Sequence, residues 1–216
     1  MTRTYAQPAQ SKLLFTVIAL LLLHSAGFLG MHSTMHEFFV KLTPANLMIS
    51  AFLLFLNHKE FNRSFFIFCV VIFFSGFFIE VIGVKTEMIF GDYVYRDTLG
   101  FRILTVPVII GLNWLMLVYS AGVICERIPA NPIVKSICGA LLMVLLDYFI
   151  EPVAQRYNFW DWDSSHPPVI NYIGWFIVSF LMLLFFYRSA FSKQNPAAFV
   201  LYLVQFGFFL LFYFYP

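Results

Sequence analysis

The sequence predicts an all-α bundle of about seven helices that spans a membrane as one integral domain, residues 1–216. Of its 216 residues, 61% are hydrophobic and only 11% are charged, which is typical of polytopic membrane proteins. Apolar runs of about the length that crosses the hydrocarbon core as a helix, roughly 20 residues, recur along the chain. The segments between them are too short to form a soluble domain, and no internal repeat indicates a transporter built from duplicated halves.

Seven apolar runs are the candidate spans. In chain order they are Leu13–Gly30, Leu42–Leu56, Ser64–Ile82, Ile103–Cys125, Ile133–Val153, Val169–Tyr187 and Ala197–Tyr215. The first resembles a signal peptide, but its apolar stretch is longer than a usual signal core, so we expect it to remain as a helix. The second is short because Pro44 delays the start of its helix, and Pro152 marks the end of the fifth.

The charges of the loops predict the orientation. With the N-terminus on side one of the membrane, side one carries eight basic residues and side two carries five. The eight are Arg3, Lys12, Lys59, Arg63, Arg127, Lys135, Arg188 and Lys193, and the five are Lys41, Lys85, Arg96, Arg102 and Arg156. Basic residues favour cytoplasmic loops, so we expect a cytoplasmic N-terminus in the cell membrane. No basic run indicates nucleic-acid binding.

The acidic residues are divided far more sharply. Only Glu60 and Glu126 belong to side one, and the other nine belong to side two or to the side-two ends of the spans. Glu80 lies near the end of one span, and Asp147 and Glu151 lie near the end of another. The last two are four residues apart, so they share a helix face. A charged group in hydrocarbon costs several kcal/mol, so such residues usually line a site or a water-filled cavity.

Polar and aromatic residues from other segments meet these acids at side two. They are Lys85, Tyr93 and Tyr95 in the loop Gly83–Arg102, Asn113 and Trp114 in the fourth span, Trp160 and Trp162 in the loop after Glu151, and Asn171 and Trp175 at the start of the sixth span. Each also has a simpler explanation. The tryptophans can form an interfacial belt, Lys85 can neutralise Glu80, Asn113 can join two helices, and Asp161 and Asp163 can be solvated loop residues.

Neighbouring carboxyl groups in apolar surroundings can divide acid and base roles between them. One stays protonated and acts as an acid, while the other acts as a base. Aromatic ring faces around such a pair stabilise a carbocation. A carboxyl pair surrounded by aromatic rings is therefore suited to proton transfer to and from an apolar substrate. No cysteine or histidine spacing resembles a metal site: Cys69, Cys125 and Cys138 fall in predicted spans, and His32 and His36 form only a lone pair.

Two blocks of sequence resemble the membrane carotenoid-biosynthesis family, which contains the carotenoid 1,2-hydratases of the bisanhydrobacterioruberin hydratase type. The first block is Glu80, Gly83-Val84-Lys85-Thr86, Phe90-Gly91-Asp92-Tyr93-Val94-Tyr95, Leu99-Gly100, Val106-Pro107 and Asn113-Trp114. The second is Gly139-Ala140, Met143-Val144, Asp147, Glu151-Pro152-Val153-Ala154, Phe159-Trp160-Asp161-Trp162, Asn171-Tyr172 and Gly174-Trp175-Phe176. The resemblance covers roughly Glu80–Ser179. Glu87 stands where a small residue is expected, so we assign it no role.

The resemblance implies the addition of water to the terminal double bond of an acyclic carotenoid end group. It also implies that the residues with a role in the family correspond here to Glu80, Lys85, Asn113, Asp147, Glu151 and Asn171. We expect Glu80, Asp147 and Glu151 to be catalytic. The expected substrate-binding residues are Lys85, Tyr93, Asn113, Trp114, Trp160, Asn171 and Trp175. The reaction needs no metal or redox cofactor. Expected partners are an acyclic or monocyclic carotenoid, the lipid bilayer and other carotenoid-biosynthesis enzymes.

Three other functions remain open from the sequence. A carotenoid end-group cyclase would also begin with proton addition but would exclude water from the cation. A retinal-binding protein would also have seven spans, but the last span, Ala197–Tyr215, has no lysine for a Schiff base. A proton or solute carrier would stagger its acids across the membrane, whereas these acids cluster at one face.

Overall fold

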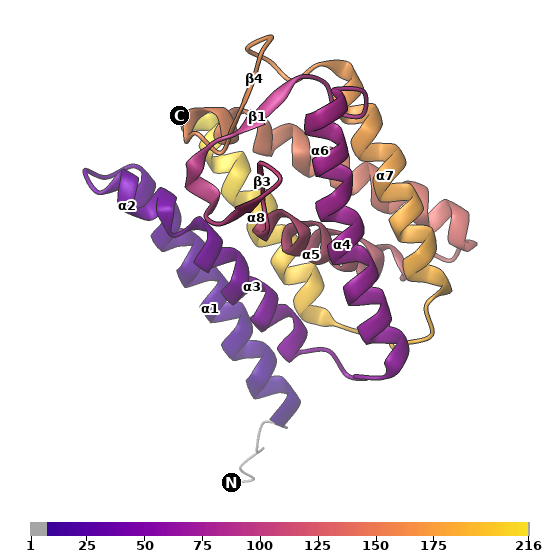
Figure 1. Cartoon of the computed structure of the whole chain (residues 1–216). Helices are drawn as coiled ribbons and strands as arrows, with labels where there is room; N and C mark the ends of the chain where they lie inside the picture. Colours follow the sequence, from indigo (N-terminus) through magenta and orange to yellow (C-terminus); the bar gives the residue numbers. More distant parts are fainter. Residues whose placement is uncertain (1–7, 216) are drawn as a thin grey trace, which may run out of the picture.

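The computed structural model describes residues 8–215, which fold into a bundle of helices (Figure 1). The helices are α1 (Pro8–Met31), α2 (His36–Lys41), α3 (Thr43–Leu56), α4 (Arg63–Thr86), α5 (Ile109–Cys125), α6 (Pro132–Arg156), α7 (Val169–Arg188) and α8 (Pro196–Phe214). Every predicted span overlaps one of these helices, and α2 is an additional short helix in the first predicted loop. The predicted all-α membrane bundle is therefore confirmed. The prediction that Pro152 ends the fifth span is wrong, because α6 continues through Pro152 to Arg156. Arg3, which contributes to the predicted charge bias, lies outside the described residues.

Five of the helices are long and apolar enough to cross a membrane: α1 (from Gln10), α4, α6, α7 and α8. The other two predicted spans correspond to shorter apolar helices, since α3 has 14 residues and α5 has 17. At 1.5 Å per residue, α5 is roughly 26 Å long, a little shorter than a typical hydrocarbon core. The number of seven spans therefore stays a prediction.

The fourth span begins later than the sequence predicts. Ile103 belongs to a small hairpin, in which β2 (Arg102–Ile103) pairs antiparallel with β3 (Val106–Pro107), and α5 begins only at Ile109. The hairpin turns at Leu104 and Thr105, whose φ angles of 52° and 73° are both positive, as in two-residue type I′ loops. Pro107 disfavours the helical conformation for the residue before it, so the helix cannot extend back into Val106.

Helix α5 is the centre of the bundle. It contacts α3, α4, α6, α7 and α8, and most of its side chains are buried. Gly111 lets α4 approach closely, because a Cβ atom at this position would lie 2.7 Å from the backbone oxygen of Phe73. The central position of α5 means that its N-terminal turns, which carry Asn113 and Trp114, are enclosed by the neighbouring helices.

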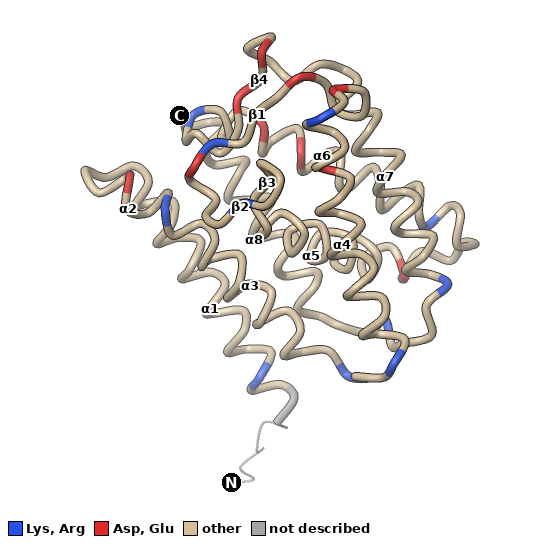
Figure 2. Tube along the Cα trace, viewed as in Figure 1, with Lys and Arg blue, Asp and Glu red and all other residues tan. Residues whose placement is uncertain are grey.

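A second pair of strands covers one end of the bundle. Strand β1 (Tyr93–Tyr95) pairs antiparallel with β4 (Trp160–Trp162), and a single 3-10 turn, η1 (Asp97–Leu99), follows β1. Figure 2 shows most of the acidic residues at this end, which we call the acidic end. The described chain begins at the opposite end and finishes at the acidic end (Figure 1). Of the loop acids there, Asp161 forms an exposed ion pair with Arg96, and Asp163 is exposed.

This arrangement gives a prediction for topology. Seven crossings place the C-terminus and the loop from Asn57 to Arg63 on opposite faces of the membrane, with the loop in the cytoplasm. Reporter fusions after the last residue and within this loop measure the two locations directly. Because the five helices α4 to α8 lie between the two reporters, finding both on the same side would mean that one of these five does not cross, and the short helix α5 would be the first to examine.

Candidate active site

Pairing of β1 with β4 brings four aromatic side chains to one place. Residues two apart in a strand point to the same face, so Tyr93 and Tyr95 face the bundle together, as do Trp160 and Trp162. Tyr93 lies opposite Trp162 and Tyr95 opposite Trp160 in the register. Val94, between the two buried tyrosines, is exposed, and Asp161, between the two tryptophans, is half-buried.

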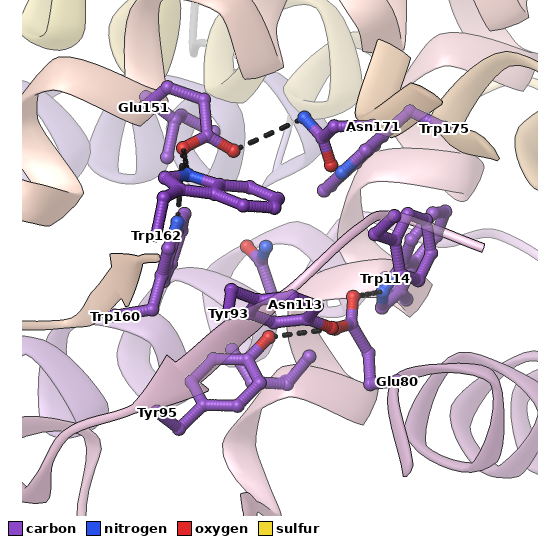
Figure 3. A pocket seen from close by; sticks show the side chains of 13 residues that line it. Glu80, Tyr93, Tyr95, Asn113, Trp114, Glu151, Trp160, Trp162, Asn171 and Trp175 are labelled. Carbon is purple, nitrogen blue, oxygen red and sulfur yellow. Dashed lines mark hydrogen bonds between the residues drawn. The ribbon is translucent and has the colours of Figure 1, made fainter. Parts of the chain in front are cut away.

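Three of the surrounding side chains donate hydrogen bonds to Glu80, which is only 4% exposed. The hydroxyl groups of Tyr93 and Tyr95 donate to Oε2 over 2.5 Å and 2.9 Å. The indole Nε1 of Trp114 donates to Oε1 over 2.8 Å. Both oxygens of this buried carboxyl group therefore have partners, and all three partners are neutral (Figure 3).

A second carboxyl group is held in the same manner. Glu151, 2% exposed, accepts hydrogen bonds at Oε2 from Nε1 of Trp160 (3.0 Å) and Nε1 of Trp162 (2.7 Å). Its Oε1 accepts a longer bond of 3.3 Å from the side-chain amide of Asn171. Strand β1 thus supplies two hydrogen-bond donors to Glu80 on α4, and strand β4 supplies two donors to Glu151 on α6. Figure 3 shows the two carboxyl groups on opposite sides of the same pocket.

Asp147 lies one helical turn before Glu151 and is completely buried. Its Oδ2 accepts a 2.9 Å hydrogen bond from the same Asn171 amide that reaches Glu151. Its Oδ1 has no hydrogen-bond partner among the described residues. An unpaired buried carboxyl oxygen is costly, which makes Asp147 unusual even in this cluster.

Two tryptophan rings form another wall of the pocket. Trp114 and Trp175 are stacked, with ring centroids 4.3 Å apart and planes 19° from parallel. Trp114 is fully buried because it lies directly against Gly76 of α4, where a Cβ atom would come within 2.4 Å of the Trp114 Cβ. Gly76 is one turn before Glu80, so the same close helix approach places the indole N–H at the carboxyl group.

The pocket between these groups has a volume of about 30 Å³. This is enough for one or two water molecules and far less than an isoprenoid end group requires. It is lined by Glu80, Phe90, Tyr93, Tyr95, Ile110, Asn113, Trp114, Ile150, Glu151, Trp160, Trp162, Asn171 and Trp175. A carboxyl group on each side of a water-sized space can give a proton to, or take one from, whatever occupies it.

The two tyrosines are stable as donors. Burial, and then the negative charge of Glu80, raises the pKa of Tyr93 and of Tyr95 well above the ordinary value. Both hydroxyl groups therefore remain protonated at every pH below the usual tyrosine range of about 10, and both continue to donate to Glu80.

The structure brings together most of the residues that the sequence predicts for the site. Eight of the ten line the pocket: Glu80, Tyr93, Asn113, Trp114, Glu151, Trp160, Asn171 and Trp175. Asp147 is not among the described lining residues, but it accepts a hydrogen bond from Asn171, which lines the pocket. Lys85 is exposed, does not line the pocket, and takes part in none of the described ion pairs, so it does not neutralise Glu80 in this structure. The catalytic and binding roles of all ten stay predictions.

Sequence reasoning missed Tyr95 and Trp162 as ligands of the two carboxyl groups. A signal was present, since Tyr93-Val94-Tyr95 and Trp160-Asp161-Trp162 both alternate with the period of a strand. The pattern is too short to be recognised as a strand in a helical membrane protein. It becomes meaningful only when the two segments, far apart in the chain, pair with each other.

A sequence model of the carotenoid biosynthesis protein family matches residues 38–214. The chain belongs to this family. The match extends well beyond the stretch from Glu80 to Ser179 that carries the resemblance, from within α2 to the end of α8, and it includes every described residue that lines the pocket. Among curated proteins and solved structures, no match was found. Membership of a carotenoid biosynthesis family is consistent with a carotenoid substrate and a bilayer around the helices.

Proposed function

We propose that this carotenoid biosynthesis protein is a hydro-lyase that adds water to the terminal double bond of an acyclic carotenoid end group. One observation carries the proposal: two buried carboxyl groups, Glu80 and Glu151, lie on opposite sides of a water-sized pocket whose remaining wall is largely aromatic. The third carboxyl group, Asp147, supports Glu151 through Asn171.

The proposed reaction has two steps. One carboxyl group transfers its proton to the less substituted carbon of the alkene, which leaves a tertiary cation on the neighbouring carbon. A water molecule then attacks the cation, and its surplus proton passes to the other carboxyl group. One C–H bond and one C–O bond form, the carbon–carbon π bond breaks, and the net addition is one water. A proton must then return from the second carboxyl group to the first, so the site needs a path between them.

The aromatic residues suit the intermediate. A cation over the face of an indole or phenol ring is stabilised by ~0.5–2 kcal/mol, more when water is excluded. Trp114, Trp175 and Trp162 line the pocket together with Tyr93 and Tyr95. Their ring faces can bind the positive charge, and in our proposal a water molecule captures the cation.

The substrate needs a path from the bilayer to this small pocket. A groove of about 260 Å³ lies between α4 and α7, helices that make few contacts with each other. Its wall includes Ile79, which precedes Glu80, and Val178, one turn from Trp175. In our proposal the polyene lies in this groove, parallel to the helices, and its end displaces Trp175 or Phe90 to reach the carboxyl groups. A carotenoid is about as long as the ~30 Å hydrocarbon core, so it fits beside them.

Hydration is favoured over cyclisation by the polar part of the pocket. Asn113 and Asn171 line it in addition to the carboxyl groups, and amide groups position water. A cyclase has to keep water away from the cation, which a pocket of this polarity does not do.

We further propose that the whole chain forms one membrane domain, that it lies in the cell membrane with a cytoplasmic N-terminus, and that it works together with other enzymes of carotenoid biosynthesis.

The pigment profile of carotenoid-producing cells tests this function. Cells with the chain should accumulate a carotenoid heavier than the acyclic precursor by one water molecule, with a tertiary hydroxyl group at the end of the polyene. Matched cells without the chain should retain the precursor. A product of unchanged mass with a ring at its end would show a cyclase, and an unchanged pigment profile would remove the enzymatic proposal.

A further inference from the structure

A second, larger cavity lies outside the candidate site. It has a volume of about 330 Å³ and is enclosed by α1, α3 and α8, with Phe39 of α2 and Phe159 also in its wall. We call it the α1–α3–α8 cavity. Its volume is in the range of small-molecule binding pockets, whereas the pocket between Glu80 and Glu151 holds only about 30 Å³. A ligand the size of an isoprenoid end group fits here without displacing a side chain.

One wall of the cavity contains a polar group without a partner. Gln205 is halfway along α8, is 4% exposed, and its side-chain oxygen accepts no hydrogen bond among the described residues. An unpaired amide in an apolar environment costs ~2–7 kcal/mol, and polar residues within a membrane usually mark function. Gln205 therefore indicates a ligand that supplies the missing hydrogen bond.

Other polar side chains line the same cavity, among them Asn46 and His24. Asn46 accepts a 3.3 Å hydrogen bond from Ser50 at Oδ1, and no described residue accepts from its amide nitrogen. His24 uses Nδ1 to donate to the backbone oxygen of Leu20 over 2.9 Å, so its Nε2 is the ring nitrogen that accepts. The cavity thus offers both a donor and an acceptor near Gln205. Among the residues that the structure describes, no Asp, Glu, Lys or Arg lines this cavity.

We propose that the α1–α3–α8 cavity binds an isoprenoid end group that carries a hydroxyl group. A hydroxyl group both donates and accepts, so it satisfies the Gln205 amide in either orientation. The absence of charged lining residues excludes a phosphate or carboxylate head group. The apolar walls, which include Phe159, Phe208 and Phe209, suit the hydrocarbon part of the ligand. An isoprenoid follows from the carotenoid biosynthesis family to which the chain belongs.

The cavity is separate from the candidate site but adjoins it through the backbone. Phe159 forms part of its wall, and the next residue, Trp160, donates a hydrogen bond to Glu151. The α1 wall, including His24 and Gly27, lies outside the residues that match the family. Binding in this cavity does not depend on the hydratase proposal, because a hydroxylated carotenoid can be recognised by a chain that does not make it.

Direct binding to the full chain in lipid nanodiscs tests the proposal. The probe is a linear carotenoid with one terminal hydroxyl group, compared with the parent hydrocarbon of equal length, and visible circular dichroism reports binding to the protein. We expect Gln205→Leu to weaken binding of the alcohol about tenfold and to leave binding of the hydrocarbon unchanged, since one hydrogen bond is lost. Gln155→Leu is the matched control, because Gln155 on α6 lines none of the described cavities, and it should bind both probes normally.

A second pair of variants fills the cavity. A Cβ atom at Gly27 lies 3.5 Å from Phe208, an ordinary contact, so Gly27→Ala should fold and bind the alcohol. Gly27→Leu extends into the cavity and should abolish alcohol binding there while catalytic conversion continues. Equal affinity for the alcohol in Gly27→Leu and Gly27→Ala overturns the proposal, as does equal loss of both probes in Gln205→Leu. If Gln205→Leu fails to fold, the Gly27 pair decides.

Discussion

Glu80→Gln should lower the conversion of the carotenoid by ~10²–10⁴-fold while the protein still accumulates in the membrane. Glutamine keeps the size of the side chain but cannot give or take a proton in the reaction. Its amide nitrogen is also a donor and replaces one of the two oxygens to which Tyr93, Tyr95 and Trp114 donate, so at least one of the three hydrogen bonds is lost. The measurement is product per unit of protein, from pigment chromatography and immunoblotting of the same membranes.

Asp163→Asn is the matched control for this variant. It makes the same acid-to-amide change at the same end of the bundle, but Asp163 is exposed in the loop after β4. Its conversion should equal that of the unmodified chain. Normal conversion by Glu80→Gln would remove Glu80 from the catalytic residues, even if Asp163→Asn behaves as expected.

Asp147→Asn should also lower conversion by orders of magnitude, about 10²-fold or more. The carboxyl group is completely buried and shares the Asn171 amide with Glu151, over 2.9 Å and 3.3 Å. Replacing it with an amide of the same shape removes a titratable group and puts two amides against each other. Pigment analysis with immunoblotting again separates lost chemistry from lost protein.

The double variant with Asn171→Leu shows how Asp147 acts. If Asp147 only positions Glu151 through Asn171, the double variant loses no more than the worse single variant, because the two residues form one chain of contacts. If Asp147 exchanges a proton itself, the free-energy losses of the two variants add. Near-normal conversion by Asp147→Asn alone would contradict any catalytic or positioning role.

Much of the fold could be predicted because hydrophobic runs determine membrane helices almost directly. The start of α5 could not, since Ile103 and Val106 are as apolar as a span and only the proline at 107 and the turn at Leu104 and Thr105 separate them from it. Helix α2 was also missed. Its six residues, His36–Lys41, contain both charged and apolar side chains and are too few to show a helical period.

Some parts of the candidate site could be predicted from the sequence, and others could not. The acids could be placed at one end, because alternating helix directions fix which ends meet. Their hydrogen-bond donors could not, because these depend on the pairing of β1 with β4, a long-range contact that no local pattern reveals. Lys85 illustrates the opposite case. It is five residues beyond Glu80 on α4, roughly one and a half turns, so the two side chains leave the helix on different faces. The Lys85 side chain is exposed at the end of α4, where its charge can reach water.

The origin of the new hydroxyl oxygen tests the central claim most directly. Membranes containing the chain should convert the carotenoid in ¹⁸O-labelled water, without oxygen gas and without added reductant. The account predicts a tertiary alcohol that carries the heavy oxygen and one new hydrogen from solvent. A strict requirement for oxygen gas, with unlabelled alcohol formed in labelled water, would contradict it and would indicate an oxygen-activating enzyme in place of a hydratase.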